Sequence, residues 1–306
     1  MKIGIIGSGG LGGLFGAFLN RNGEDVYLYD IWEDHVRAIN NQGLFIERIE
    51  KDDFRVHPPA TTNPEDIGTV DVVFVFVKSH HTEESIMAAE PMINDDTVIV
   101  TVQNGLTNID TNEKIYPDNP IMAGPTYVGG TTTAPGHIEE KVLLDESETK
   151  IGSVNSEVEL GIVELLSDAG IPSTSVENPV GHVWDKQLAI IGFVPISALT
   201  GLPMGPIAEN EELSPIMESL VEEAIEVGKA KDVGIFSEDY VEKAYHLCER
   251  VPNTKPSTLV DVENERPTEI DHLNGAIVRY GEEFGIDTPY NRMLTALLKG
   301  KEQSYL

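Results

Sequence analysis

The sequence predicts an α/β protein, with a doubly wound, mainly parallel sheet over residues 1–177 and an all-helical domain over residues 178–306. Three observations lead to this division. A short apolar run at the N-terminus passes directly into a cluster of glycines. Strand-like apolar runs then alternate with helical patterns through the first half of the chain. Long amphipathic segments, without a strand-like run, fill the second half.

The first strand, residues 2–6, is rich in β-branched side chains, and glycines follow it at once. Gly7, Gly9 and Gly12 form the pattern G-x-G-x-x-G, with Ser8 between the first two. The first glycine permits a tight turn, the second lets a pyrophosphate approach the backbone, and the third lets the helix pack close to the strand. N–H groups at the helix start then face the phosphates. This order of strand, glycines and helix predicts a Rossmann-type domain with a bound dinucleotide.

The second strand, residues 26–29, ends at Asp30, about twenty residues beyond the glycines. A carboxylate there can accept hydrogen bonds from the ribose hydroxyls of NAD, but it repels the 2′-phosphate of NADP. Residues 30–33 contain no Arg or Lys, and Arg37 is the one nearby cation that could offset this repulsion. We therefore expect NAD as the cofactor in preference to NADP.

Two near-continuous apolar runs, residues 70–79 and 96–105, are typical of strands buried on both faces. Lys78 and Asn104 lie at the ends of these runs, at the carboxyl edge where a doubly wound sheet binds ligands. Each residue alone also fits a simpler role, Lys78 as a solvated loop lysine and Asn104 as a turn residue before Gly105. Further strands are expected at residues 120–130, 137–146, 150–154 and 173–177, and a helix at residues 156–168.

Helices are expected in the second half at residues 179–200, 212–233, 237–250, 267–285 and 289–303. Helical spacing places Lys186, Ile190 and Val194 on one face. A lysine at the head of an apolar stripe fits a charged group in a cleft, and equally a lysine whose ammonium extends to water. Glu269 lies in a first helical turn, where a purely structural cap would explain it. Ser257 lies in an expected loop and has no role from its position alone.

The composition excludes several classes of partner. Lys and Arg number 21 against 52 Asp and Glu, so the formal net charge is −31. Such a surface repels nucleic acid and anionic membranes. No apolar run reaches the length of a membrane span, and the chain enters a strand without a signal-peptide pattern. Cys248 is expected to be a buried apolar side chain, and the adjacent His80 and His81 lack metal-ligand spacing, so no metal is expected. We expect a soluble, cytoplasmic protein.

Several motifs together resemble those of the ketopantoate reductase (2-dehydropantoate 2-reductase) family. They are GSGGLG at residues 7–12, VKS at 77–79, QNG at 103–105, W-x-K at 184–186 and PSTLVDVENERPTEIDHLNGAIV at 256–278. The last block is long and specific. The resemblance implies a Rossmann domain joined to a helical domain, which together reduce a 2-oxo acid to the D-2-hydroxy acid.

The resemblance also implies roles for individual residues. The implied cofactor contacts are Gly7, Gly9, Gly12, Lys78 and Asn104, and Asn104 should also approach the reacting centre. Lys186 matches the family's catalytic lysine, Glu269 its acidic residue, and Ser257 a serine that contacts substrate. An ammonium at Lys186 would stabilise the negative charge that builds on the carbonyl oxygen, and could donate the proton.

This chain departs from the family pattern at three positions. Ile190 and Val194 stand where ketopantoate-specific members carry asparagines, and Asp30 stands where NADPH-using members carry a basic residue. A substrate hydroxyl buried without a partner costs about 1–3 kcal/mol, whereas an apolar pocket gains about 0.8 kcal/mol per buried methylene. The sequence therefore resembles the NAD-dependent D-2-hydroxyacid dehydrogenases of this family, including D-mandelate dehydrogenase. These act on branched-chain or aromatic 2-oxo acids.

Two alternatives stay open at this point. The first is reduction of 2-dehydropantoate to D-pantoate. The second is a protein of another class, a redox sensor that binds NAD(H) without catalysis. The helical domain is also compatible with a homodimer, although no segment identifies its interface.

Overall fold

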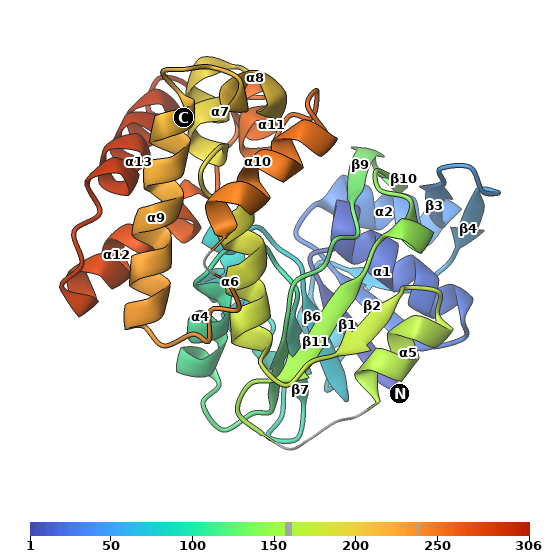
Figure 1. Ribbon diagram of the computed structural model, residues 1–306. Helices are drawn as coiled ribbons and strands as arrows, with labels where there is room; N and C mark the ends of the chain where they lie inside the picture. Colours follow the sequence, from blue (N-terminus) through green and yellow to red (C-terminus); the bar gives the residue numbers. More distant parts are fainter. Residues whose placement is uncertain (157–160, 238) are drawn as a thin grey trace. The chain divides into compact units, whose positions relative to one another are not determined.

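The computed structural model describes residues 1–156, 161–237 and 239–306, and its chain divides into two compact units (Figure 1). The N-terminal unit comprises residues 1–104 and 108–179, and the helical unit comprises residues 105–107 and 180–306. The domain boundary expected after residue 177 stays a prediction. Residues 157–160 and 238, which belong to two of the expected helices, lie outside the described residues.

The N-terminal unit is built on an eight-stranded sheet in the order β12-β11-β8-β7-β6-β1-β2-β5 (Figure 1). Its strands are β1 (Lys2–Ile6), β2 (Asp25–Tyr29), β5 (Ala60–Thr61), β6 (Val72–Val75), β7 (Val98–Thr101), β8 (Ile121–Ala123), β11 (Thr149–Ser153) and β12 (Ser173–Ser175). Neighbouring strands pair in parallel except β8 with β11. The predicted doubly wound α/β fold is confirmed.

Helices cover both faces of this sheet: α1 (Gly10–Arg21), α2 (Glu33–Gln42), α3 (Thr82–Ala88), α4 (Asn108–Ile115) and α5 (Ile162–Asp168). Alternate residues of β1 point to opposite faces. Ile3 and Ile5 pack with Phe15 of α1 in one core, and Ile6 packs with Ile86 of α3 in the other. The central strands are thus buried on both faces, which explains their continuous apolar runs.

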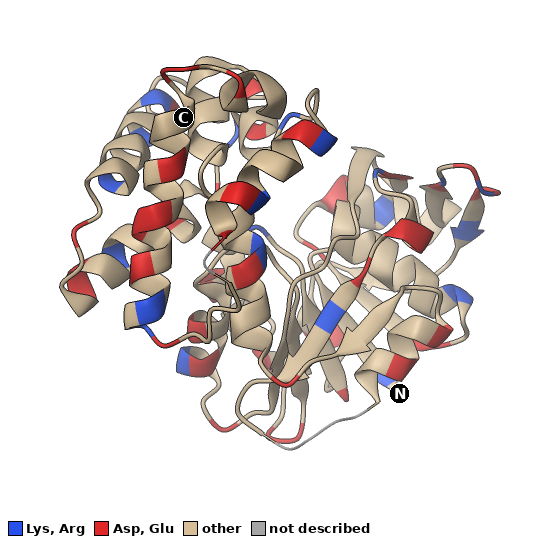
Figure 2. Cartoon of the chain, viewed as in Figure 1, with Lys and Arg blue, Asp and Glu red and all other residues tan. Residues whose placement is uncertain are grey.

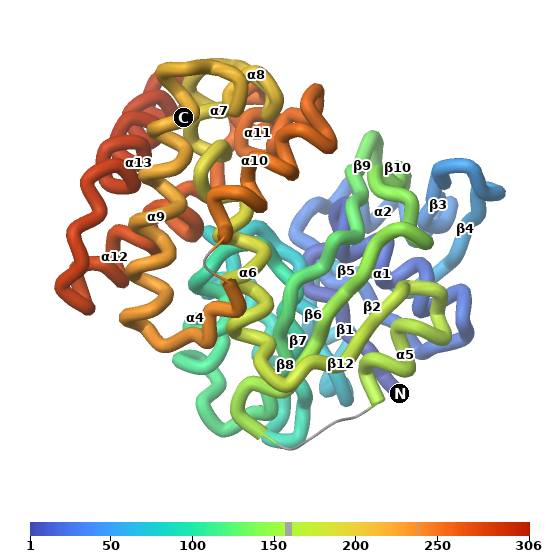
Figure 3. The backbone as a smooth tube through the Cα atoms, in the orientation of Figure 1, coloured from blue at the N-terminus to red at the C-terminus, as the bar shows by residue number. Residues whose placement is uncertain are grey.

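A second, four-stranded sheet in the order β4-β3-β10-β9 adjoins α1 in the same unit, and was not expected from the sequence. Its strands are β3 (Leu44–Glu47), β4 (Phe54–Val56), β9 (Gly130–Ala134) and β10 (His137–Glu140). The chain path in Figure 3 shows β9 and β10 as the arms of a hairpin, and their residues pair antiparallel. The strand expected at residues 137–146 therefore ends at Glu140.

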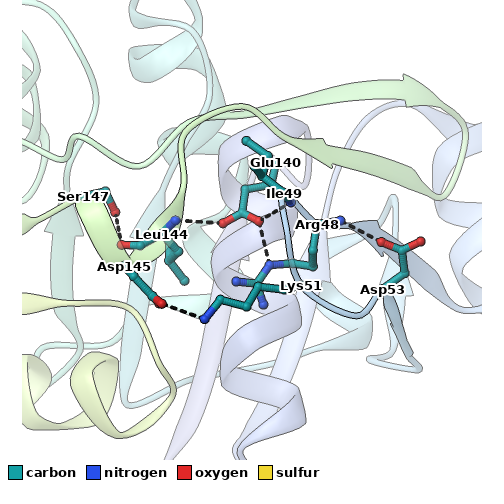
Figure 4. A network of polar contacts seen from close by, with 8 residues as sticks. All are labelled: Arg48, Ile49, Lys51, Asp53, Glu140, Leu144, Asp145 and Ser147. Carbon is teal, nitrogen blue, oxygen red and sulfur yellow. Dashed lines mark hydrogen bonds and ion pairs between the residues drawn. The ribbon is translucent and has the colours of Figure 1, made fainter.

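The carboxylate of Glu140, the last residue of β10, binds the loop after β3 and the segment after β10 (Figure 4). One oxygen accepts hydrogen bonds from Arg48 Nε at 2.7 Å and from the Ile49 amide at 3.0 Å. The other accepts from the Leu144 amide at 2.9 Å. The side chains of Arg48 and Glu140 are 8% and 0% exposed. The ion pair is therefore buried, with both carboxylate oxygens satisfied.

The described part of the second unit contains helices and no strand, as predicted. Its helices are α6 (Pro179–Ile190), α7 (Val194–Thr200), α8 (Met204–Ala208), α9 (Ser214–Ala230), α10 (Tyr240–Arg250), α11 (Ser257–Glu263), α12 (Asn274–Phe284) and α13 (Pro289–Glu302). None of the helices in the described ranges is long and apolar enough to cross a membrane.

The expectation of one helix over residues 179–200 is wrong. The chain turns between α6 and α7, so Val194 begins a new helix and does not share a face of α6 with Lys186 and Ile190. Pro195, at the second position of α7, has no N–H to continue the α6 hydrogen-bond ladder. At the turn, a Cβ on Gly192 would lie 2.8 Å from Met217 of α9, so the backbone is packed too closely for a side chain.

The contribution of the buried Arg48–Glu140 ion pair to stability can be tested by mutation. Replacing Glu140 with Gln should lower the free energy of unfolding by about 3 kcal/mol, because the Arg48 charge then stays buried without its counter-ion. Asp145→Asn is the matched control, since its 2.7 Å ion pair with Lys51 is exposed and screened by solvent. Urea denaturation measures both. An equal loss of stability in the two variants would show that burial does not make the Arg48–Glu140 pair more important than the exposed Lys51–Asp145 pair.

Candidate active site

The glycine loop has the backbone geometry that a pyrophosphate needs. Gly7 has φ +87°, in the left-handed region that favours glycine, and its amide donates to Tyr29 O at 2.9 Å. A Cβ on Gly12 would overlap the Gly7 carbonyl oxygen, so α1 packs directly on the loop. At Gly9, the residue before α1, a Cβ would meet only Thr132 Oγ1, at 3.9 Å. The loop therefore offers bare backbone and helix N–H groups to a phosphate.

Asp30 is held firmly against this loop. Its Oδ2 accepts hydrogen bonds from the Ser8 amide at 2.7 Å and from Ser8 Oγ at 3.0 Å, and its Oδ1 accepts from the Trp32 amide at 3.0 Å. These donors use three of the roughly four acceptor positions of a carboxylate. A ribose hydroxyl would meet the remaining one, and a second hydroxyl would have to replace the Ser8 hydroxyl. Ser8 thus positions Asp30, a role that the sequence did not indicate.

The VKS and QNG motifs meet at the carboxyl edge of β6 and β7. Gln103 Nε2 donates to the Val77 carbonyl oxygen at 2.6 Å, and Ser79 Oγ donates to the Asn104 carbonyl oxygen at 2.7 Å. Asn108 Nδ2 donates to the same Asn104 oxygen, also at 2.7 Å. The loops that carry Lys78 and Asn104 are therefore bonded to each other. Gln103, Ser79 and Asn108 were missed as positioning residues, although two of them lie within the quoted motifs.

Lys186 on α6 and Glu269 form an interacting pair in the helical unit. The Lys186 side chain keeps some exposed surface, yet burial lowers its pKa to about 8, and the negative charge of Glu269 opposes that lowering. Glu269 is buried and precedes the short turn at Ile270–His272, with α12 beginning only at Asn274. The expectation that Glu269 lies in the first turn of a helix is therefore wrong. The Glu269 side chain makes no capping hydrogen bond to this turn, so a capping role does not explain it.

The other expected substrate contacts lie in different surroundings. Ser257 is the first residue of α11 and is exposed, so the expectation that it lies in a loop is wrong. Val194 is buried in the core of the helical unit with Phe193 and Met217, and Ile190 packs half-buried against that core. Their contacts with substrate, like the cofactor contacts of Lys78 and Asn104, stay predictions.

Comparisons with known proteins decide the family. The family model described as "Ketopantoate reductase PanE/ApbA" matches residues 3–156, and "Ketopantoate reductase PanE/ApbA C terminal" matches residues 180–302. The chain belongs to the ketopantoate reductase family. The resemblance inferred from the motifs is thereby confirmed. Membership makes the chain an oxidoreductase, and the glycine loop of its Rossmann domain fits an NAD(P) cofactor.

Curated relatives match over almost their whole length. The 2-dehydropantoate 2-reductase of Streptococcus pyogenes serotype M1 is 28% identical over 303 residues, which cover 99% of this chain and 98% of that protein. The enzyme of the same name from Aquifex aeolicus is 29% identical over 309 residues, covering 99% and 97%.

Solved structures show the same fold. A PanE/ApbA family ketopantoate reductase from Ralstonia eutropha is 30% identical, with a TM-score of 0.92 over 100% of this chain and 99% of that one. D-mandelate dehydrogenase with NADH and anilino(oxo)acetate is 25% identical, with a TM-score of 0.91 over 100% and 99%. A ketopantoate reductase and a D-mandelate dehydrogenase thus both share the fold of this chain.

The geometry at Gly9 leads to a test of the phosphate cradle. Gly9→Ala should leave the free energy of unfolding nearly unchanged, because the new Cβ meets only an ordinary van der Waals contact. It should nevertheless weaken NADH binding by about tenfold, or about 1.4 kcal/mol, since the methyl group occupies the approach to the backbone. Fluorescence titration measures affinity, and Gly300→Ala in open space on α13 is the control. Unchanged affinity in Gly9→Ala would place the phosphates elsewhere.

Proposed function

We propose that this protein is a 2-dehydropantoate 2-reductase, which transfers hydride from a nicotinamide dinucleotide to the C2 carbonyl of 2-dehydropantoate and forms D-pantoate. The observation that carries the proposal is the half-buried Lys186, whose pKa is lowered by burial against the opposing charge of Glu269, in a chain whose full-length relatives bear this name. The relatives thus favour the alternative over the apolar 2-oxo acid expected first from Ile190 and Val194.

The reduced cofactor would supply the hydride. As the hydride reaches C2, negative charge builds on the carbonyl oxygen, and the Lys186 ammonium would stabilise that charge and donate the proton. With a pKa of about 8, Lys186 is mostly protonated at neutral pH but releases its proton more readily than an ordinary lysine. The negative charge of Glu269 favours the charged form of Lys186 and so offsets part of the effect of burial on the pKa. The cation also provides local attraction for an anionic substrate, which the net charge of −31 otherwise repels.

We further propose NAD(H) as the preferred cofactor. Asp30 is fixed by Ser8 and the Trp32 amide, so its charge cannot swing away from a 2′-phosphate. Arg37, the basic residue that follows Asp30 in the sequence, is 63% exposed and pairs with Asp34 at 2.9 Å and Glu33 at 3.7 Å. Its charge is therefore already offset by two acids.

A second candidate is an NAD-dependent D-2-hydroxyacid dehydrogenase for branched-chain or aromatic substrates. It is favoured by Ile190, four residues after Lys186 on the same helix face, and by the likeness to D-mandelate dehydrogenase. A non-catalytic redox sensor is the third hypothesis, and the Lys186–Glu269 pair speaks against it, because a sensor has no need of a proton donor.

The proposal also covers the partners, the cellular location and the oligomeric state of the protein. Acidic side chains are spread over both units and outnumber basic ones (Figure 2), which supports a small-molecule substrate and argues against nucleic acid or membrane partners. A cytoplasmic location and a homodimer formed through the helical unit complete the proposal.

The substrate is tested by comparing kcat/KM for 2-dehydropantoate, phenylglyoxylate and 4-methyl-2-oxopentanoate, each with NADH and NADPH. We expect 2-dehydropantoate with NADH to give the highest value. Lys186→Ala should lose about a hundredfold or more in kcat, because general acid catalysis and charge stabilisation vanish together, while NADH binding stays intact. Preference for an aromatic or branched acid would favour the second candidate, and absence of turnover would favour the sensor.

The pKa of Lys186 predicts the pH dependence of reduction. The proton donor is present below about pH 8 and is lost as the pH rises through that value, so kcat/KM should fall on the alkaline side. Glu269→Gln removes the charge that opposes the lowering of this pKa, so the alkaline limb should move to lower pH. Stopped-flow rates across the pH range measure both profiles. Identical profiles would mean that Glu269 does not act on Lys186.

A further inference from the structure

A buried histidine connects the glycine loop to the β9–β10 turn. His35 on α2 is 0% exposed, and its Nε2 lies 2.9 Å from the Ser8 carbonyl oxygen. The Gly136 amide donates to His35 Nδ1 at 3.0 Å. Because an amide N–H can only donate, Nδ1 must accept, and the ring proton therefore resides on Nε2, which donates to Ser8. The imidazole is neutral and both of its nitrogens are used.

The hairpin that His35 holds forms one wall of the glycine loop. A Cβ on Gly10 would overlap the Gly130 carbonyl of β9, and a Cβ on Gly13 would overlap the Ile138 side chain of β10. The hydroxyl of Thr132 on β9 lies next to Gly9, and this buried group has no hydrogen-bond partner in the described residues. The position of the hairpin thus determines the space in front of the phosphate-binding backbone.

His35 also supports Asp30, the residue expected to face the ribose. Trp32 stacks on the imidazole, with ring centroids 5.1 Å apart and planes inclined by 11°. The Trp32 amide donates to Asp30 Oδ1 at 3.0 Å. One side chain therefore contacts the glycine loop, the hairpin and the segment that fixes Asp30. These are three parts of the dinucleotide site that lie far apart in the sequence.

We propose that His35 is a positioning residue for the dinucleotide site: its neutral imidazole clamps the glycine loop to the β9–β10 turn and thereby sets the affinity for the cofactor. Loss of the clamp weakens dinucleotide binding but leaves the chemical step of the saturated enzyme unchanged, because Lys186 carries that step. The inference rests on the proposed function in placing a dinucleotide at the glycine loop and in assigning the chemical step to Lys186.

Protonation should release the clamp. A proton on Nδ1 would face the Gly136 N–H, so two donors would oppose each other and this bond would be lost. Burial lowers the pKa of His35 below its ordinary value, while Asp30 opposes that lowering. The clamp is therefore intact at neutral pH and is lost as the pH falls through the lowered pKa. Other charged or titratable groups on the neighbouring elements are Glu33, Asp34 and Arg37 of α2, Glu139, Glu140 and His137 of β10 with its partner Glu47 of β3, and His57 beside Gly43.

The test compares NAD⁺ binding, which can be followed in acid, by calorimetry in steps from about pH 7.5 down to about pH 5. His35→Leu should bind about tenfold more weakly at the higher pH, with kcat at saturating NADH close to that of the wild type. His35→Gln keeps one donor and one acceptor, so it should restore affinity to within about threefold. It should also lose the acid-side fall in affinity. His137→Gln is the matched control and should retain the wild-type affinity and pH dependence.

Each outcome decides the matter. Wild-type affinity in His35→Leu would overturn the clamp. If circular dichroism shows that this variant does not fold, an unchanged acid-side fall in His35→Gln overturns it, and a flat response supports it. A wild-type protein that binds no dinucleotide refutes the cofactor assignment and this inference together. A protein that binds NAD⁺ but reduces no 2-oxo acid refutes the proposed function alone.

Discussion

Close backbone contact around residues 7–13 is the constraint on which the N-terminal unit depends. Helix α1 starts against the loop only because Gly12 has no Cβ to meet the Gly7 carbonyl, and the β9 backbone reaches the same loop only because Gly10 has none. These contacts leave helix N–H groups as the surface for a phosphate. The Asp30 carboxylate and the His35 imidazole then fix the loop from the side, through Ser8.

Burial lowers the pKa of two basic groups, yet the two groups differ in the protonation state that they use. It lowers the pKa of both His35 and Lys186, because a charged form loses its hydration inside the protein. At His35 the Gly136 amide needs an acceptor, so the neutral ring is the form that satisfies its surroundings. At Lys186 the charge of Glu269 opposes the lowering, so the amine stays mostly protonated at neutral pH, which the proposed role as proton donor requires. The neighbouring group, the Gly136 amide in one case and Glu269 in the other, therefore decides which protonation state is favoured.

Much of the candidate site could be predicted because its residues lie in short local patterns. The glycine pattern, Asp30 after the second strand, and Lys78 and Asn104 at strand ends all depend on spacing within one strand–loop–helix unit. The missed residues act across long separations. His35 bonds to Gly136, and Gln103 bonds to Val77, through contacts between elements that the chain does not bring together locally. The second sheet was missed for the same reason, since it pairs β3 with β10.

The sequence by itself determined the α/β class, the alternation of strands and helices, the helical second half and the family, because periodicity and contiguous motifs are properties of neighbouring residues. Only the tertiary structure decided where helices stop and what each titratable group faces. It ended α6 at Ile190, placed Val194 in a core, and left Glu269 without a capping hydrogen bond but with its charge acting on Lys186. The physical reason is that packing and burial depend on partners from distant segments, which no local pattern specifies.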